Sequence, residues 1–263
     1  IENDTEEHPQ LDSDQFFMQE FPAAIHELFQ QSGRAVFAGA RLAEMMAHAK
    51  VNKPKLLFAM DGKGTPKRVR YERHANLFVW DKPVKHGIYV IGIDVARGLK
   101  NRDRSWITVF RRLDEYHIKQ VAEWRGWIGP KYLGDIATTI AMWYNDAFIV
   151  PEENDAGRGT IDTITLENGY TNVYIYKPIG TVGGQMHDSS VRYGFVTTSR
   201  TKGQIVKELG SSIEFRLIQI MSTELLDEAM TFQFDDKGNP CAPNGGRDDG
   251  VMSAAMANYG TGP

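Results

Sequence analysis

Residues 87–110 read GIYVIGIDVARGLKNRDRSWITVF, and this stretch decides the fold. A first apolar run, 88–93, leads into Asp94, a Gly-containing turn follows, and a second apolar run, 106–110, returns. The pattern predicts a hairpin whose first strand is too apolar for the edge of a sheet. Asp94 thus ends a buried strand, where a carboxylate needs a partner, and a metal ion is the first candidate. Taken alone, Asp94 is explained equally well as the residue that ends the strand or caps the turn.

Length and composition allow one large domain, or one domain with an appendage. The chain has 263 residues, of which 41% are hydrophobic and 11% aromatic. A single cysteine, Cys241, excludes an internal disulfide framework and fits a reducing compartment. No apolar run approaches the roughly 20 residues that span a bilayer, and no signal-peptide pattern opens the chain. We therefore expect a soluble intracellular protein without a membrane partner, and the first residue, Ile1, suggests a fragment or a processed chain.

The overall charge does not announce a nucleic-acid-binding protein. Lys and Arg number 30 against 34 Asp and Glu, which gives a net charge of −4. Basic residues nonetheless cluster twice, at Lys63, Lys67, Arg68, Arg70 and Arg73 and at Arg97, Lys100, Arg102 and Arg104. A solvated charged face is the common explanation of such clusters. Because the second cluster adjoins Asp94, a phosphate backbone stays open as its partner.

Residues 1–85 are interpreted as an N-terminal appendage that packs on the main domain. An acidic lead-in over 1–15 precedes a helix within 16–33, with a Pro where it starts and a Gly where it stops. A second amphipathic helix is expected at 40–50, and strands over 55–80 with a turn at Asp61 and Gly62. We expect the boundary between this appendage and the main domain at residues 81–83.

Residues 86–263 alternate between strand and helix patterns, which is typical of a layered α/β sheet. After the hairpin we expect strands at 117–124, 147–151, 173–177, 195–198, 214–220 and 231–234, helices at 130–145, 159–168, 201–209 and 222–230, and a loop at 178–193. The last element, residues 247–257, reads RDDGVMSAAMA and predicts a small-residue helix that can pack tightly against a sheet.

Acidic residues lie at three places where a predicted strand ends or a predicted helix begins. Glu152 follows the buried strand 147–151, and Asp248 with Asp249 open the final helix, in addition to Asp94. Functional groups of an open α/β sheet gather at strand ends and helix starts, and converging carboxylates repel one another unless a cation holds them. Oxygen ligands of this kind suit Mg²⁺ or Mn²⁺, and two such ions can hydrolyse a phosphodiester. The competing interpretation is that Asp248 and Asp249 are the N-cap and first-turn acids of their helix.

Two other kinds of site are not indicated. No His, Cys or Glu spacing suggests zinc, and Cys241 is interpreted as a bystander rather than a nucleophile. The run at 62–65, GKGT, lacks the leading Gly of a P-loop and is interpreted as a hairpin turn. We therefore do not expect ATP hydrolysis through a P-loop.

Six phrases in order, over about residues 16–257, resemble the C-terminal nuclease region of the large terminase subunit of tailed bacteriophages. They are QEFPAAIHELFQQSGRAVF (19–37), GIDVARG (92–98), RDRS (102–105) in place of the usual Gly-Asp-Tyr-Ser, PEENDAG (151–157), YGFVTTSRTKG (193–203) and GRDDGVMSAAMA (246–257). The resemblance implies a ribonuclease H-like layered α/β fold, with a central mixed β-sheet flanked by helices, over 86–263.

The resemblance also implies roles for individual residues. It assigns catalysis and the binding of two Mg²⁺ or Mn²⁺ ions to Asp94, Glu152, Asp248 and Asp249, with Glu153 a less favoured occupant of the second position and Arg247 where the family often has His. It places Lys202 near phosphate, although a solvated Lys at a helix start explains it equally well, and it places the 178–193 loop near the active site. We interpret Arg97, Lys100, Arg102 and Arg104 as a candidate wall for the DNA strand, and Asp103 as a structural residue or, at most, a residue that lies behind the metal ligands.

The implied function is that of an endodeoxyribonuclease that cuts concatemeric viral DNA during genome packaging, with low sequence preference because phosphate contacts carry no sequence information. The implied partners are double-stranded DNA and, in a full-length protein, an ATPase domain, the small terminase subunit and the portal protein, and the implied location is the host cytoplasm. Three alternatives stay open: a junction-resolving nuclease of the same fold, an actin-like or sugar-kinase ATPase, and a non-catalytic DNA-docking module.

Overall fold

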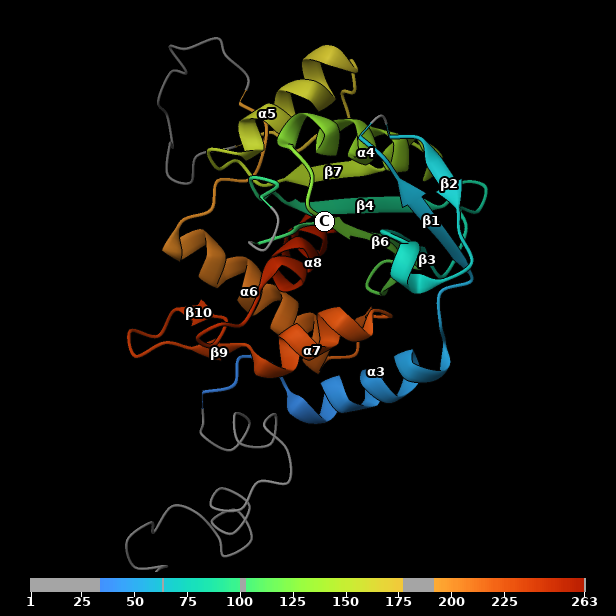
Figure 1. Cartoon of the computed structure of the whole chain (residues 1–263). Coiled ribbons are helices and arrows are strands. Elements are labelled where there is room, and N and C mark those ends of the chain that lie inside the picture. The colour runs from blue at the N-terminus through green and yellow to red at the C-terminus, as the bar shows by residue number, and fades with distance from the viewer. Residues whose placement is uncertain (1–33, 63, 100–102, 177–191, 263) are drawn as a thin grey trace, which may run out of the picture.

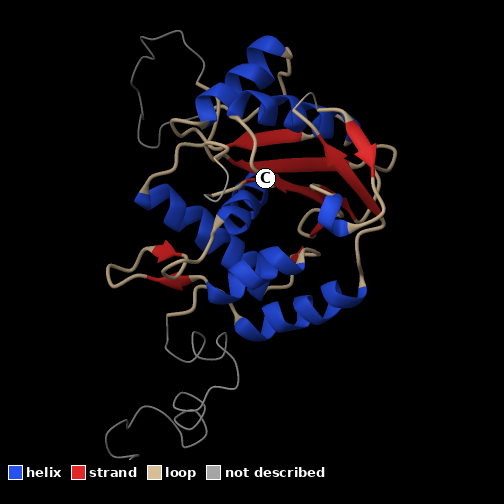
Figure 2. Cartoon of the chain, in the orientation of Figure 1, coloured by secondary structure: helices blue, strands red, loops and turns tan. Residues whose placement is uncertain are grey.

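The structure is a computed structural model that describes residues 34–62, 64–99, 103–176 and 192–262. The helix expected within 16–33, most of the loop expected at 178–193, and the side chains of Lys63, Lys100 and Arg102 lie outside these ranges. Within them, eight strands form one mixed sheet, and helices cover both of its faces (Figures 1 and 2). The expected fold class is confirmed.

The opening hairpin forms the centre of the sheet. Strand β4 (Ile88–Asp94) pairs antiparallel with β5 (Ser105–Arg112), which pairs antiparallel with β6 (Ile118–Gly126). On its other side, β4 pairs in parallel with β7 (Phe148–Pro151). The prediction that the first strand of the hairpin is internal is therefore confirmed.

Three N-terminal strands extend the same sheet. Strands β1 (Leu56–Met60) and β2 (Pro66–Arg68) pair with each other, a short 3₁₀ turn η1 (Glu72–His74) follows, and β3 (Leu77–Val79) joins β1 to β6. Strands on both sides of the expected boundary at 81–83 thus belong to one sheet. The division into two domains at residue 85 stays a prediction.

The helices form two layers (Figure 1). Helix α4 (Pro130–Trp143) and helix α5 (Gly157–Asp162), which continues into the π-helical segment η2 (Thr163–Glu167), cover one face. The other face carries α3 (Gly39–Val51), α6 (Ser199–Glu214), α7 (Thr223–Thr231) and α8 (Asp249–Gly260). Strands β9 (Gln233–Phe234) and β10 (Pro240–Cys241) form a separate small ribbon. None of the helices in the described ranges has both the length and the apolar character that crossing a membrane requires.

Alternation along β4 divides its side chains between the two layers. Ile91 and Ile93 are buried in the core under α4, whereas Val90 is buried in the core under α8. Gly92 also faces α8: a Cβ atom built on it would lie 2.0 Å from the carbonyl oxygen of Ser253. The Ser253 hydroxyl donates to the Gly92 carbonyl oxygen at 2.9 Å. Helix α8 therefore lies directly on β4, as its small residues predicted.

Three predicted strands are wrong in extent. The strand expected at 214–220 is reduced to β8 (Ile218–Gln219), which pairs in parallel with β6, because α6 continues to Glu214 and buries Leu209 and Ile213. The strands expected at 173–177 and 195–198 are single bridges, including Ile149 with Val173 and Glu152 with Phe195.

Candidate metal centre

Strand register brings the first two acidic motifs together. In the parallel pair of β4 and β7, Ile93 lies opposite Pro151, and the Glu152 N–H group donates to the Ile93 carbonyl oxygen at 2.9 Å. Asp94 and Glu152 directly follow this pair, so both lie at the edge of the sheet that is formed by the carboxyl ends of β4 and β7. Burial, followed by the charge of Glu152 and a hydrogen bond with it, raises the pKa of the Asp94 carboxyl well above its ordinary value.

The third motif reaches the same edge from α8. Asp248 has the N-cap position of this helix but makes no side-chain cap bond, and Asp249 is the first helical residue. The Oδ2 atom of Asp249 instead accepts a hydrogen bond from the Arg104 backbone N–H group at 3.2 Å. The structure thus places the two aspartates at the N-cap and in the first turn of α8, as the competing interpretation expected, but the Asp248 side chain does not cap the helix.

Asp249 is the more deeply buried of the two aspartates, and this residue is only 3% exposed. Burial raises the pKa of Asp249 to about 6, and the charges of Asp103 and Asp248 act in the same direction. The Arg104 N–H group and the Arg104 charge oppose this shift. Asp103, which lines the same cleft, thus acts on the Asp249 carboxyl through its charge.

All four predicted acids line one cleft of about 740 Å³. The residues that share this cleft with Asp94, Glu152, Asp248 and Asp249 include Arg97, Asp103, Glu153, Asn154, Asp155, Thr197 and Lys202. Carboxylates from β4, β7 and α8 therefore converge in a single concave, polar site.

The carboxylates are held by protein donors. Lys202 Nζ donates to Asp248 Oδ2 at 2.8 Å, and Asn154 Nδ2 donates to Glu152 Oε2 at 2.6 Å. Within the described ranges, no three Asp, Glu, His or Cys side chains are arranged as they stand to hold one metal ion. The chemistry of the set nonetheless fits a hard divalent cation, because the donors are carboxylate oxygens and because burial and neighbouring carboxylates raise the pKa values of Asp94 and Asp249.

The predicted basic residues divide into three groups. Arg97 and Lys202 line the cleft, with side chains that are 74% and 24% exposed. Lys100 and Arg102 lie outside the described residues. The predicted DNA contact of Arg104 is wrong. This residue is 8% exposed and its guanidinium lies 2.5 Å from Glu224, so it is not available to a DNA strand.

Glu153 lines the cleft but its carboxylate is directed to basic partners. Its oxygens lie 2.6 Å from Arg192 and 3.5 Å from Arg158, and its side chain is 7% exposed. The structure thus brings Glu152, rather than Glu153, into hydrogen-bonding contact with Asp94.

Two residues of the site were not predicted. Asn154 donates to both Glu152 and the Val95 carbonyl oxygen, at 2.6 and 3.1 Å, and thereby joins the ends of β7 and β4. Its position directly after the acidic pair was the available signal. Glu228, on α7, accepts hydrogen bonds from the start of α8 and has no local signal in the sequence. Burial, with the charge of Asp249 next, raises the pKa of Glu228 to about 7.

Comparisons with known proteins agree with this architecture. No family model and no curated protein matches the sequence. Among solved structures, the magnesium-bound large terminase nuclease from the thermophilic phage G20c matches with a TM-score of 0.57 and 20% identity, over 86% of this chain and 97% of that chain. The cobalt-bound form gives 0.57 and 19% over the same shares. The large terminase nuclease domain of Thermus phage P74-26 gives 0.52 and 21%, over 85% and 93%. The chain has the fold of these terminase nucleases, which is ribonuclease H-like.

Proposed function

We propose that this chain is the nuclease domain of a phage large terminase and is a metal-dependent DNA endonuclease that cuts concatemeric viral DNA during genome packaging. The observation that supports the proposal most is the convergence of Asp94, Glu152, Asp248 and Asp249 in one cleft. The cleft is placed on a fold shared with terminase nucleases, one of which was solved with bound magnesium. The shared fold supports a nuclease role, and the four acids support a metal-dependent reaction.

The four carboxylates would hold two Mg²⁺ or Mn²⁺ ions. Such a pair supplies the positive charge that activates an attacking water and stabilises the leaving oxygen of a phosphodiester. The carboxylates come from β4, from the end of β7 and from the start of α8, so three elements of the fold would hold the ions. Glu152 and Asp249 are buried, so their charges would act more strongly than they would in water.

The substrate would be double-stranded DNA, held through its backbone. Lys202 and Arg97 line the cleft, and we expect them to contact phosphate oxygens beside the acids. Contacts to phosphate carry no base information, so cleavage would have low sequence preference. In a full-length protein the expected partners are an ATPase domain, the small terminase subunit and the portal protein, in the cytoplasm of the host.

A plasmid-nicking assay tests the proposal. Supercoiled plasmid should be cut in the presence of Mg²⁺ or Mn²⁺, and Asp94→Asn should abolish cutting. Asp236→Asn is the matched control, because Asp236 is 84% exposed and pairs with Arg34 away from the cleft residues. Undiminished cutting by Asp94→Asn would refute the assignment. DNA binding that falls with salt but needs no metal, with no cutting, would favour a docking module instead.

A further inference from the structure

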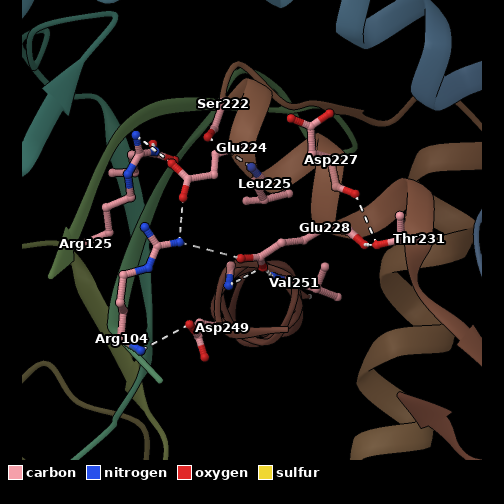
Figure 3. Close-up of polar contacts among 12 residues, drawn as sticks. Arg104, Arg125, Ser222, Glu224, Leu225, Asp227, Glu228, Thr231, Asp249 and Val251 are labelled. Atoms are coloured by element: carbon pink, nitrogen blue, oxygen red, sulfur yellow. Dashed lines mark hydrogen bonds and ion pairs between the residues drawn. The ribbon is translucent and has the colours of Figure 1, made fainter. Parts of the chain in front are cut away.

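The start of α8 is capped by a side chain from a different helix. The first backbone N–H groups of an α-helix have no acceptor within the helix. Because Asp248 makes no cap bond, Glu228 of α7 supplies the acceptor: its Oε2 atom receives the Gly250 N–H group at 2.8 Å and the Val251 N–H group at 3.3 Å (Figure 3). Glu228 thus performs the task that usually belongs to the N-cap residue.

The close approach of Glu228 is possible because residue 250 is glycine. A Cβ atom on Gly250 would lie 2.9 Å from Glu228 Oε2 and 3.2 Å from the Trp106 ring. The first turn of α8 is therefore held between α7 and β5. Trp106 lies opposite Asp94 in the hairpin register, so this packing also fixes α8 relative to the strand that carries Asp94.

Arg104 links the cap to the acidic site. Its guanidinium lies 3.9 Å from Glu228 Oε1 (Figure 3). It also lies 5.2 Å from the Trp106 ring centroid. Its backbone N–H group donates to Asp249 Oδ2. One buried residue thus contacts both the capping carboxylate and a carboxylate of the cleft. Because a buried charge is costly without a partner, the Arg104 side chain is tied to the acids of α7.

We propose that Glu228 is a positioning residue of the acidic centre. By capping α8 from α7, it leaves the carboxylates of Asp248 and Asp249 free to face the cleft, and with Arg104 it fixes the place of Asp249. Without this cap, the nearest replacement acceptor for the free N–H groups is the Asp248 side chain, since Asp at this position readily caps its own helix. That rotation would withdraw Asp248 from the cleft. The inference rests on the proposed function, in which these carboxylates bind cations.

Two conservative variants separate the reach of Glu228 from its charge. Glu228→Asp keeps the charge but is one methylene shorter, so its oxygens no longer reach Gly250 and Val251. Glu228→Gln keeps the length and an amide oxygen that can accept the same bonds. Glu224→Gln is the matched control, because Glu224 also contacts Arg104, at 2.5 Å, but accepts nothing from α8.

The first measurement is hydrogen exchange of the Gly250 and Val251 amides in the metal-free protein. A helix cap is worth about 1 kcal/mol, so protection in Glu228→Asp should fall by roughly five- to tenfold. Glu228→Gln and Glu224→Gln should retain protection within about threefold. The second measurement is titration with Mn²⁺ by calorimetry, in which Glu228→Asp should bind about tenfold more weakly than the wild type and Glu228→Gln within about threefold.

The outcomes discriminate between the two proposals. Unchanged Mn²⁺ affinity in Glu228→Asp, or a loss in Glu228→Gln as large as in Glu228→Asp, would overturn the positioning role, because either result shows that the reach of the cap does not matter. Failure of the wild-type protein to bind Mn²⁺ would overturn the proposed function instead. In that case the amide exchange of the metal-free variants would still decide whether Glu228 caps α8.

Discussion

Replacing Asp249 by Asn should stabilise the metal-free protein at neutral and alkaline pH. The folded chain raises the pKa of Asp249 to about 6 from an ordinary 3.8, chiefly by burial. For an acid whose folded pKa lies above its unfolded pKa, ionisation costs stability: the cost is absent below 3.8, grows between 3.8 and about 6, and is complete above that range. Asn cannot ionise, and its amide oxygen can still accept the Arg104 N–H bond.

The magnitude follows from the pKa difference. At about 1.4 kcal/mol per pH unit, the full cost is about 3 kcal/mol at pH 8 and about half of that at pH 5. The expected gain from Asp249→Asn is therefore about 3 kcal/mol at pH 8 and about 1.5 kcal/mol at pH 5.

Urea unfolding at both pH values, in chelator, measures this gain. Asp155→Asn is the control: it also removes a cleft carboxylate, but one that is 93% exposed, and it should change stability by less than ~0.5 kcal/mol. Metal should then cancel most of this difference in stability. A ligand at 100 times its Kd stabilises the folded state by about 2.7 kcal/mol, and Asp249→Asn should lose most of that effect. If Asp249→Asn is less stable than the wild type at pH 8 without metal, the electrostatic reasoning about this site is wrong.

Three further predictions concern packing and the contacts of the acids. Gly92→Ala should lower the free energy of unfolding by about 3 kcal/mol in urea, because its Cβ would lie 2.0 Å from the Ser253 carbonyl oxygen. Gly203→Ala on α6 is the control: its Cβ would meet open space, so the protein should gain up to ~1 kcal/mol. Equal effects of the two substitutions would contradict the packing of α8 on β4. Lys202→Met should tighten Mn²⁺ binding about two- to fivefold in calorimetry, because Asp248 loses the cation with which it pairs, and weaker binding would contradict that competition. Asn154→Ala should lower the free energy of unfolding by about 1 to 3 kcal/mol, since Asn154 joins Glu152, Val95 and the Gly157 N–H group, and a neutral result would show that these bonds are replaced by water.

Local patterns were sufficient for the central elements and the principal acids. The apolar run before Asp94 predicted an internal strand, and the small residues after Asp249 predicted a helix in close contact with the sheet. Both signals are local, because the spacing of apolar and small residues along a strand or helix determines which face is buried. The extent of α6 was less predictable, since burial of Leu209 and Ile213 against other helices extends it beyond the predicted end.

The amino-acid sequence by itself thus determined which strand is central and which acids end the strands. Only the tertiary structure decided how those acids are held. Arg104, which the sequence predicted as a DNA contact, is a buried partner of Glu224, and Glu228 of α7 caps α8. The reason is physical. The charge, burial and hydrogen bonding of a side chain depend on residues that are distant in the chain, whereas strand and helix periodicity depends on neighbours.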